Sequence, residues 1–502
     1  MDFSVNIDAS LQECLYNPEK TKMLNKWTEF YPTIPGNLLD SIEPDTNNPL
    51  MYWGTIPVRQ QMVDIIRLTG FRVFGLIRSQ LNEIKKQEKE KDGSIWNAYN
   101  FPRRFRELFL NDRVMLGEMR LDLIVNPKAY YESIVHNKPV CINDIWIIEW
   151  NTETPGFYAE TYSLQALVND YFSTTCPNFK DGLDWGMIHG KGNCDYYSAV
   201  CKASGLDPKS TQLTFTYPGT ELTNYVQVEN VDFAERMAQF QHFGYDVQFL
   251  YFQDLIIDAF QAVKGVYDGQ IFEESKLQKI SVLYSHFPTE FLMIEEFTSM
   301  VGEFCPDLFE GYEMTSVWEI FQNMILKGDV IRLPGSVSFV AQNKGFYAMI
   351  YDHYLNNQLN ESDSKVVKDH FLPTFLTSED AQEQESWYNQ KIVKKPVNGR
   401  KGAGISIFNV DSLGNIESII DTNESHTPVI NDWYQSQDTI LQHYRELPKI
   451  QLNDATLSIM FTVYVSPTGQ GCGVAARAYS LETVDVINEK NDIWVPLSVL
   501  ND

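Results

Sequence analysis

Two short polar pairs in the sequence combine residue types that could hold a metal ion and a phosphate. Arg120 and Asp122 are separated by one residue, and so are Glu149 and Asn151. Because side chains alternate across a strand, residues two apart project from the same face. Carboxylate and amide oxygens from Asp122, Glu149 and Asn151 are ligands that Mg²⁺ shares with water and nucleotide phosphates. Ordinary exposed strand faces are the alternative, but Glu149 follows the apolar run IWII, where a carboxylate is unusual.

A second polar segment, residues 395–404, has the composition of a phosphate-binding hairpin. It reads KPVNGRKGAG and is followed by the strand-like run ISIFNV. Glycines let the backbone approach a phosphate closely, and the cations of the segment would balance its charge. The P-loop pattern GxxxxGK[ST] is absent from it. A basic surface hairpin explains the same residues, so the segment alone leaves both interpretations open.

Arg477 is a third candidate, because it ends the glycine-containing, strand-like segment QGCGVAAR. A fixed guanidinium can hold the oxygens of a transferring phosphoryl group through two hydrogen bonds. A salt-bridge partner is the commoner role of a single arginine. The histidines form neither HxH nor HExxH, so they indicate no zinc site.

The elements that would position these residues alternate between helix and strand. Apolar residues recur at three- and four-residue spacing over residues 56–90, which predicts a helix. Strands are predicted at 115–125, 145–151, 247–252 and 279–285, and a strand, a tight turn and a helix at 184–203. The polar residues 356–390 are interpreted as a surface connection between two units. This alternation predicts an α/β region with parallel strands.

The charge of the chain excludes one class of function. With 40 Lys and Arg against 67 Asp and Glu, the formal net charge is −27. A nucleic-acid-binding protein needs basic stripes that neutralise phosphates, so we predict no nucleic-acid partner. The same negative field would favour a cationic substrate such as a polyamine, although many acidic proteins have none.

The cysteines and the absence of long apolar runs indicate a compartment. Seven scattered cysteines without a CxxC motif predict neither a disulfide framework nor a zinc cluster, but reduced thiols. The first residues lack the basic and apolar regions of a signal peptide, and no apolar run is long enough to span a membrane. We therefore expect a soluble, cytoplasmic protein without a membrane partner, and the sequence leaves its oligomeric state open.

Taken in order, the segments resemble the synthetase domain of glutathionylspermidine synthase and its ATP-grasp relatives. That family shows R-x-D, E-[YW]-N-x-[DE]-[ST]-P, W…P…NK, K-P-x-x-G-R-x-G-x-N, I-[YF]-Q…LP, and a glycine-rich strand before an arginine. The corresponding residues here are Arg120-Leu-Asp122, Glu149 to Pro155, Trp318…Pro334…Asn343-Lys344, Lys395 to Gly404, Ile440-Leu-Gln442…Leu447-Pro448, and Gly471…Arg477. Each motif is weak alone, but six in the family's order, from about residue 110 onward, indicate a relationship.

The resemblance implies roles for individual residues. It implies that Asp122, Glu149 and Asn151 hold Mg²⁺, and that Arg120 and Arg477 are catalytic groups at the phosphates and the reacting acyl phosphate. Further residues are implied to bind ATP, with Arg120 among them: Lys395, Gly399, Arg400, Gly402, Gln442, Tyr444 and Leu447. The implied substrate-binding residues are Thr154 and Glu290. The family's asparagine after R-x-G-x is replaced by Gly404, and an acid that is common after the last arginine is replaced by Ala478.

The resemblance also implies a fold and an activity. The expected fold is α+β or α/β, a permuted ATP-grasp fold in which the metal ligands precede the lysine loop. We expect a mostly helical N-terminal region over residues 1–110, a pre-ATP-grasp α/β region carrying the metal ligands over 111–355, and a nucleotide-binding region with the lysine loop over 356–502. The implied activity is an ATP- and Mg²⁺-dependent ligase that joins a small-molecule or peptide carboxylate to an amine through an acyl phosphate, releasing ADP and phosphate. The alternative is an inactive ATP-grasp scaffold that binds nucleotide or peptide.

Overall fold

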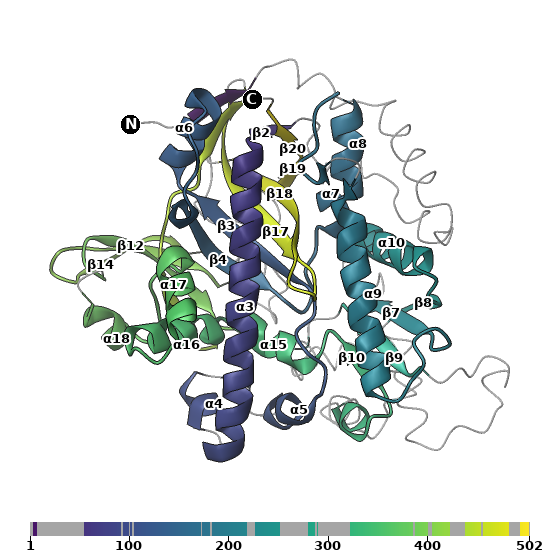
Figure 1. Ribbon diagram of the computed structural model, residues 1–502. Helices are drawn as coiled ribbons and strands as arrows, with labels where there is room; N and C mark the ends of the chain where they lie inside the picture. The colour runs from purple at the N-terminus through teal and green to yellow at the C-terminus, as the bar shows by residue number, and fades with distance from the viewer. Residues whose placement is uncertain are drawn as a thin grey trace, which may run out of the picture.

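Three main sheets and the helices around them form the described part of the chain (Figure 1). The computed structural model describes residues 4–7, 55–91, 94–99, 101–102, 105–171, 173–180, 183–217, 226–251, 280–286, 289, 322–384, 387–399, 404–421, 437–452, 455–480 and 492–500. Mixed helices and strands in several sheets confirm the predicted α+β or α/β class.

The largest sheet has seven strands and carries two of the predicted motifs. Its strands are β1 (Ser4–Ile7), β16 (Lys449–Leu452), β17 (Ala455–Val465), β18 (Gly471–Ser480), β19 (Asp492–Val495), β3 (Met119–Val125) and β4 (Ile145–Asn151). β17 is central: it pairs antiparallel with β16, β18 and β3, and β3 pairs antiparallel with β4. Strands from all three predicted regions therefore share one sheet, and the boundaries of those regions stay a prediction.

A 32-residue helix, α3 (Gln60–Lys91), lies across this sheet (Figure 1). Its apolar residues recur at helical spacing and join one buried cluster with alternate residues of the strands; from α3 these are Met62, Val63, Ile66, Val73, Phe74, Leu76, Ile77, Leu81 and Ile84. An added Cβ at Gly70 would lie 3.0 Å from Val465 of β17, so helix and sheet approach closely there. The predicted helix over 56–90 is confirmed, except that residues 56–58 form strand β2 (Ile56–Val58).

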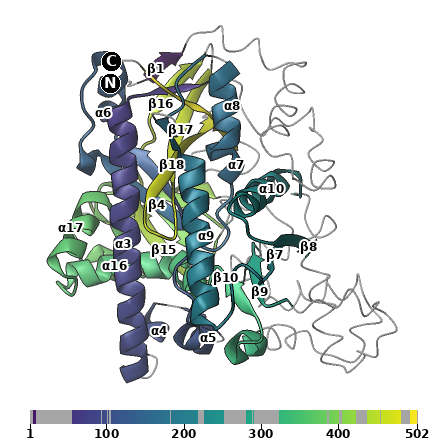
Figure 2. The same cartoon turned by 45° about the vertical axis from the view of Figure 1, so that its right-hand side comes forward.

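The second sheet is parallel, as the alternation of helix and strand predicted. Its order is β10 (Ile331–Leu333), β9 (Val282–Ser285), β7 (Leu213–Tyr217), β8 (Val247–Tyr251), and every neighbouring pair is parallel. α9 (Trp185–Ala203) and α10 (Val226–His242) pack against each other beside it, as two views show (Figures 1 and 2). Strands predicted at 247–252 and 279–285 are confirmed as β8 and β9.

The third sheet is antiparallel and contains the predicted lysine hairpin. Its order is β11 (Thr374–Phe375), β15 (Thr439–His443), β12 (Gln390–Pro396), β13 (Ser406–Val410), β14 (Ile416–Asp421). β12 and β13 follow each other in the chain and pair antiparallel, as a hairpin requires. α16 (Lys344–Leu355), α17 (Glu361–His370) and α18 (Ser378–Gln382) lie on this side of the molecule (Figure 1).

The remaining described elements are short or peripheral. They are α4 (Ser94–Ala98), α5 (Arg106–Asn111), α6 (Pro127–His136), the 3₁₀ turn Ile142–Asp144, α7 (Tyr158–Thr161), α8 (Ser163–Tyr171), β5 (Phe179–Lys180), β6 (Leu183–Asp184), α15 (Ser336–Gln342) and β20 (Leu497–Val499).

Two predictions about local structure were wrong. Residues 185–203 form one continuous helix, α9, in place of a strand, a turn and a helix, and only β6 precedes it. Its glycines serve contact: an added Cβ at Gly190 would lie 2.5 Å from Gln239 of α10, and one at Gly192 would lie 2.9 Å from Ser466. The polar stretch 356–390 contains α17, which contacts α3 and β4 and buries Val366, Val367 and His370.

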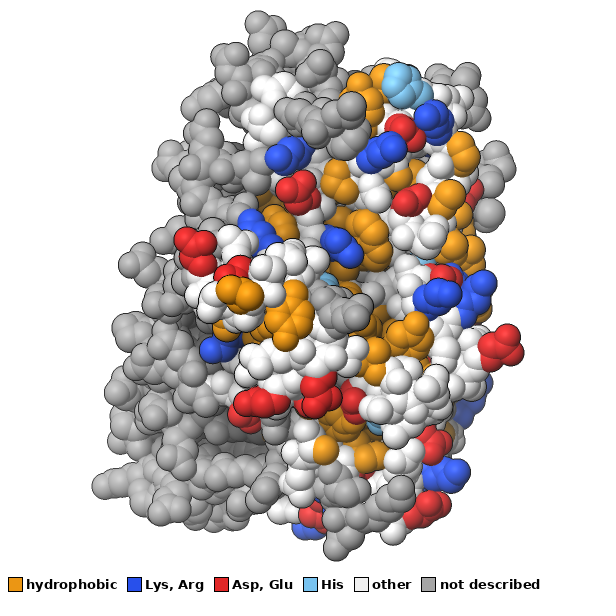
Figure 3. Space-filling model, turned by 90° about the vertical axis from the view of Figure 1, so that its left-hand side faces the viewer, with side chains coloured by type: hydrophobic (Ala, Val, Ile, Leu, Met, Phe, Trp, Pro, Cys, Tyr) orange, Lys and Arg blue, Asp and Glu red, His pale blue; other side chains and the backbone are white. Residues whose placement is uncertain are grey.

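Two features of the described residues bear on partners. None of the helices in this part of the chain is both long enough and apolar enough to cross a membrane. On the face shown in Figure 3, basic and acidic side chains are interspersed with apolar ones over the coloured residues. The coloured residues of that face therefore form no broad basic surface, in agreement with the negative net charge.

Candidate active site

The candidate site begins at the paired strands β3 and β4. On β3, Met119, Leu121 and Leu123 join the buried apolar cluster. The alternation of a strand therefore turns Arg120 and Asp122 to its other face. Both side chains are nonetheless buried, at 6% and 0% exposure.

A β-bulge in β4 brings Glu149 to the same face as Asp122. Ile145 and Ile147 point into the core, so uninterrupted alternation would send Glu149 there as well. The register shifts at this point: Leu123 pairs with Ile147, but Asp122 pairs with Glu149. The additional residue, Ile148, reverses the alternation, so that Trp150 takes the core position. Asn151 then lies opposite Arg120, and the two predicted pairs share one face.

Asp122 is held by two arginines from neighbouring strands. Arg120 Nε donates to Asp122 Oδ1 at 3.0 Å and its Nη2 donates to Oδ2 at 2.9 Å, a bidentate pair. Arg477, on β18, places Nη1 3.5 Å from Asp122 Oδ2. Burial raises the pKa of Asp122 above its ordinary value and the neighbouring Glu149 adds to this, while the two arginines act against it. Both carboxylate oxygens thus face guanidinium groups.

Glu149 faces two lysines. Lys344 Nζ lies 3.6 Å from Glu149 Oε2, and the Glu149 side chain is 36% exposed. Partial burial disfavours its ionised form, yet Lys344, then Lys395, outweigh this and hold the pKa of Glu149 below its ordinary value. The carboxylate is therefore ionised and open on one side, which suits a metal ligand or a phosphate-bound ion.

Lys395, at the end of β12, is buried with 4% exposure. Its Nζ donates to Gln442 Oε1 of β15 at 2.8 Å and to the carbonyl of Ile148, in the bulge, at 3.4 Å. Burial lowers the pKa of Lys395 to about 8, against the opposing effect of Glu149. Lys395 of the third sheet thus contacts β4, the bulged strand of the first sheet.

A pocket opens between these groups. It has an empty volume of about 240 Å³ and is lined by Ile148, Glu149, Trp150, Gln342, Asn343, Lys344, Tyr347, Ile440 and Gln442. This volume includes open solvent, so the enclosed part of the pocket is smaller than a whole nucleotide requires. Of the predicted ATP-binding residues, Gln442 lines it and Lys395 contacts Gln442.

The structure places the other predicted residues around this centre or leaves them outside the described residues. Tyr444 and Leu447 follow β15; Lys391 Nζ lies 4.3 Å from the centre of the Tyr444 ring, and Leu447 is half-buried. The Gly399 carbonyl accepts a hydrogen bond from Lys344 Nζ at 2.5 Å. Thr154 is half-buried in the turn after β4. Three predicted residues lie outside the described part of the chain: Arg400, Gly402 and Glu290. The roles of all these residues stay predictions.

Two residues that contact the site, Lys344 and Phe157, were given no role by the sequence. Lys344 stands in the NK motif quoted above, and only the folded chain shows that it faces Glu149. Phe157 follows β4 and the turn, and its ring lies beneath the guanidinium groups of both Arg120 and Arg477. No spacing pattern predicts this contact, because Arg477 is distant from Phe157 in the sequence.

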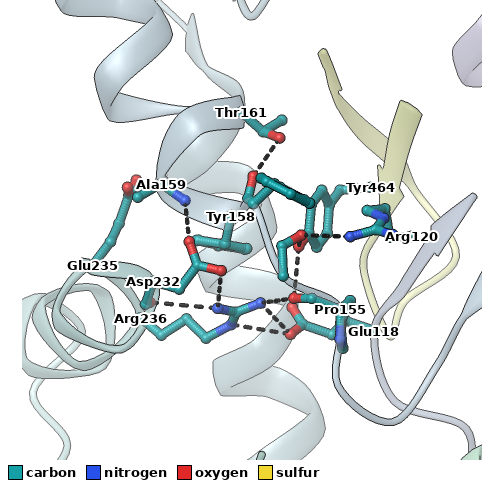
Figure 4. A network of polar contacts seen from close by, with 12 residues as sticks. Glu118, Arg120, Pro155, Tyr158, Ala159, Thr161, Asp232, Glu235, Arg236 and Tyr464 are labelled. Atoms are coloured by element: carbon teal, nitrogen blue, oxygen red, sulfur yellow. Dashed lines mark hydrogen bonds and ion pairs between the residues drawn. The ribbon is translucent and has the colours of Figure 1, made fainter. Parts of the chain in front are cut away.

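The turn between β4 and α7 is anchored by a buried polar network (Figure 4). Arg236 of α10 donates from Nη2 to the Pro155 carbonyl at 3.0 Å, and Tyr464 of β17 donates to the same carbonyl at 2.7 Å. Arg120 Nη1 donates to the Gly156 carbonyl at 3.0 Å. Three elements thus fix the turn beside the candidate site.

Comparison with known proteins identifies a family for most of this region. The family model described as glutathionylspermidine synthase preATP-grasp matches residues 140–485. No curated protein sequence matches the chain. Among solved structures, a glutathione synthetase-like effector from Globodera pallida, in its apo form, is similar with 9% identity and a TM-score of 0.49, over 97% of this chain and 98% of that one.

Proposed function

The chain belongs to the glutathionylspermidine synthase preATP-grasp family, and from this premise we propose that it is an ATP- and magnesium-dependent ligase that joins a carboxylate to an amine. Its substrates are a small-molecule or peptide acid and an amine. Four described cysteines, Cys141, Cys194, Cys201 and Cys472, form no disulfide, as in proteins of a reducing compartment, which supports the cytoplasm as its location.

The observation that carries the proposal is the charge of the site. Four cationic side chains converge on two carboxylates: Arg120 and Arg477 on Asp122, and Lys344 and Lys395 on Glu149. Four positive charges and two negative ones leave a net charge of +2, in a protein whose overall charge is −27. A partly buried excess of positive charge favours a polyanion such as a triphosphate.

The oxygen atoms of the site are of the types that bind magnesium. Asp122, Glu149 and Asn151 offer two carboxylates and an amide on one strand face, and Mg²⁺ commonly uses one or two carboxylates with water and phosphate oxygens. Glu149 is open for this role, whereas Asp122 has to exchange part of its contact with Arg120. Magnesium bound here would neutralise phosphate charge and orient the phosphates.

The residues of the site can divide the reaction between them. Lys395 and Gln442 would hold ATP at the border of the first and third sheets. Arg120 and Arg477 would face the transferring phosphoryl group, whose charge spreads over its equatorial oxygens. A carboxylate oxygen of the acid attacks the γ-phosphorus and ADP leaves; the amine then attacks the acyl carbon, and phosphate leaves. The amine loses a proton in the second step, and the products are an amide, ADP and phosphate.

One observation favours a second candidate, a protein that binds nucleotide without ligating. Both oxygens of Asp122 already face Arg120, so a metal ion has to compete for this carboxylate. If the arginine pair persists with nucleotide bound, the protein is an ATP-grasp scaffold that binds nucleotide or peptide.

The decisive experiment incubates the protein with ATP, Mg²⁺ and a panel of acids and amines, and measures ADP and phosphate. We expect ADP release that requires both an acid and an amine, and transfer of one ¹⁸O from a labelled carboxylate into phosphate. Glu149→Gln, which keeps the shape of the side chain and removes its charge, should abolish this release. AMP with pyrophosphate, or no oxygen transfer, would exclude the acyl-phosphate route; nucleotide binding without turnover would indicate the scaffold.

A further inference from the structure

Phe157 lies between the two arginines of the candidate site. The guanidinium carbon of Arg477 is 4.9 Å from the centre of the Phe157 ring, and that of Arg120 is 5.4 Å from it. A cation within about 6 Å of an aromatic face is attracted to the negative charge on that face. One ring therefore contacts both guanidinium groups, which come from different strands.

The backbone conformation of Phe157 is unusual for its residue type. Its φ is 69°, in the left-handed region that residues other than glycine, asparagine and aspartate seldom adopt. Such conformations persist where the surroundings determine them. Here the preceding carbonyls of Pro155 and Gly156 accept hydrogen bonds from Arg236, Tyr464 and Arg120.

The ring meets an electrostatic need of the site. Arg120 and Arg477 both lie next to Asp122, and like charges at this separation repel each other. Asp122 attracts both arginines, and Glu149 attracts them as well. The face of an aromatic ring adds stabilisation without a third carboxylate, which would repel phosphate oxygens.

We propose that Phe157 is a positioning residue that holds Arg120 and Arg477 on one aromatic platform and fixes their separation for a transferring phosphoryl group. The platform itself is independent of the reaction; its use on a phosphoryl group rests on the proposed function. Phe157 acts through the arginines and has no direct part in the reaction.

The first test concerns the platform alone and uses the full chain without nucleotide. NMR of arginine side chains labelled with ¹³C and ¹⁵N, assigned through Arg120→Lys and Arg477→Lys, should show both guanidinium signals shifted upfield by the ring current. Phe157→Leu should remove both shifts, and Phe157→Tyr should retain them. Guanidinium signals that are identical in the protein and in Phe157→Leu would overturn the proposal, whatever the protein does with ATP.

The second test concerns the use of the platform and compares two probes by calorimetry. MgADP lacks the transferring group, whereas MgADP with aluminium fluoride mimics it. Phe157→Leu should weaken binding of the aluminium fluoride complex roughly tenfold, the loss expected for about 1.4 kcal/mol of cation–π stabilisation, and change MgADP affinity less than twofold. Phe157→Tyr should bind both probes as the unmodified protein does. A purely structural role would weaken both probes alike and would overturn the assignment.

A further variant covers the case in which Phe157→Leu fails to fold. Phe157→Gly removes the ring and suits the positive φ, so the turn should stay intact. It should show the same selective loss for the aluminium fluoride complex, and equal affinities in this variant and the unmodified protein would contradict the proposal. If the unmodified protein binds neither probe, the proposed function fails, while the NMR result still decides whether the platform exists.

Discussion

At the scale of single residues, the candidate site buries charged groups, and burial disfavours the charged form of each of them. Lys395 is almost fully buried, and its pKa falls to about 8 for that reason. Glu149 opposes this fall, and Lys395 in turn lowers the pKa of Glu149. At neutral pH both groups are charged because each stabilises the other, and a bound triphosphate would add to the stabilisation of Lys395.

Lys395→Met should weaken the binding of MgATP while leaving the fold intact. A hydrogen bond to a charged group contributes about 1.5–3 kcal/mol, so we expect roughly a ten- to hundredfold loss of affinity. Calorimetric titration with MgATP measures it. Lys394→Met is the matched control, because Lys394 is the adjacent residue of β12 and is exposed. Equal affinities of the two variants would contradict the role given to Lys395.

Arg477→Ala should remove most turnover while keeping much of the ATP binding. Loss of one preorganised donor at a developing negative charge typically costs about 2.7–4 kcal/mol, roughly a hundred- to a thousandfold in rate. ADP release with the acid and amine that support the fastest reaction measures it. Arg477→Lys should recover only part of the rate, since an ammonium cannot reproduce two parallel hydrogen bonds. A rate in Arg477→Ala within a few-fold of normal would remove this arginine from the mechanism.

At the scale of elements, α3 supports the sheet that carries the site, and a glycine of α3 and a glycine of the sheet differ in what surrounds them. Gly75 has open space around an added Cβ, whereas an added Cβ at Gly471 of β18 would lie 2.5 Å from the backbone oxygen of Arg67 in α3. The first glycine is exposed on a helix; the second allows helix and strand to come together.

Gly75→Ala should therefore stabilise the protein and Gly471→Ala should destabilise it. Alanine in place of glycine within a helix gains about 0.5–1 kcal/mol, and overpacking at a tight contact costs about 1–3 kcal/mol. Urea-induced unfolding of both variants beside the unmodified protein measures the two changes. Destabilisation by Gly75→Ala would mean that the exposed face of α3 is covered in solution.

The sequence predicts the elements of this fold where its local pattern is strong. Alternation and helical spacing predict β3, β4 and α3, and a glycine-rich basic turn between apolar runs predicts the hairpin of β12 and β13. The pattern misleads within α9, where Gly190 and Gly192 resemble turn residues but allow close contacts. Glycine is favoured both in turns and where two elements pack closely, so its presence in the sequence does not distinguish the two.

The candidate site is predicted only in part, because some of its contacts depend on tertiary pairing. Asp122 and Glu149 follow from their spacing and from the motif order. The bulge at Ile148, which turns Glu149 to the face of Asp122, depends on the register with β3. The ring contacts of Phe157 depend on β18, which lies far along the chain. Long-range contacts of this kind leave no local pattern.

At the scale of the whole molecule, Glu118 links the first sheet to the parallel one. It precedes β3 and accepts hydrogen bonds from His189 of α9 at 2.9 Å, Arg236 of α10 at 3.0 Å and Tyr284 of β9 at 2.7 Å. Arg236 also donates a hydrogen bond to the Pro155 carbonyl, in the turn that precedes Phe157. The network therefore connects the packing of the first sheet against the parallel sheet and its helices with the turn beside Arg120.

His189 makes this connection sensitive to pH. It is fully buried, and burial disfavours its charged form, but contacts with Cys472 and Glu118 outweigh this and raise the pKa of His189 to about 9. The folded state thus holds the proton more tightly than the unfolded state, whose histidine titrates near 6.5. The stabilising contribution is complete below about pH 6.5 and is lost as the pH rises through about 9.

His189→Gln should therefore destabilise the protein strongly at pH 6 and much less at pH 10. A shift between about 6.5 and about 9 corresponds to a contribution on the order of 3 kcal/mol at low pH. Thermal unfolding of both proteins across this range measures the difference, and groups common to both, such as Lys395, cancel in it. His242→Gln, at the exposed end of α10, is the control for the effect of the substitution itself at a site outside this network. A destabilisation by His189→Gln that is the same at pH 6 and pH 10 would show that His189 contributes by packing and not by its charge beside Glu118.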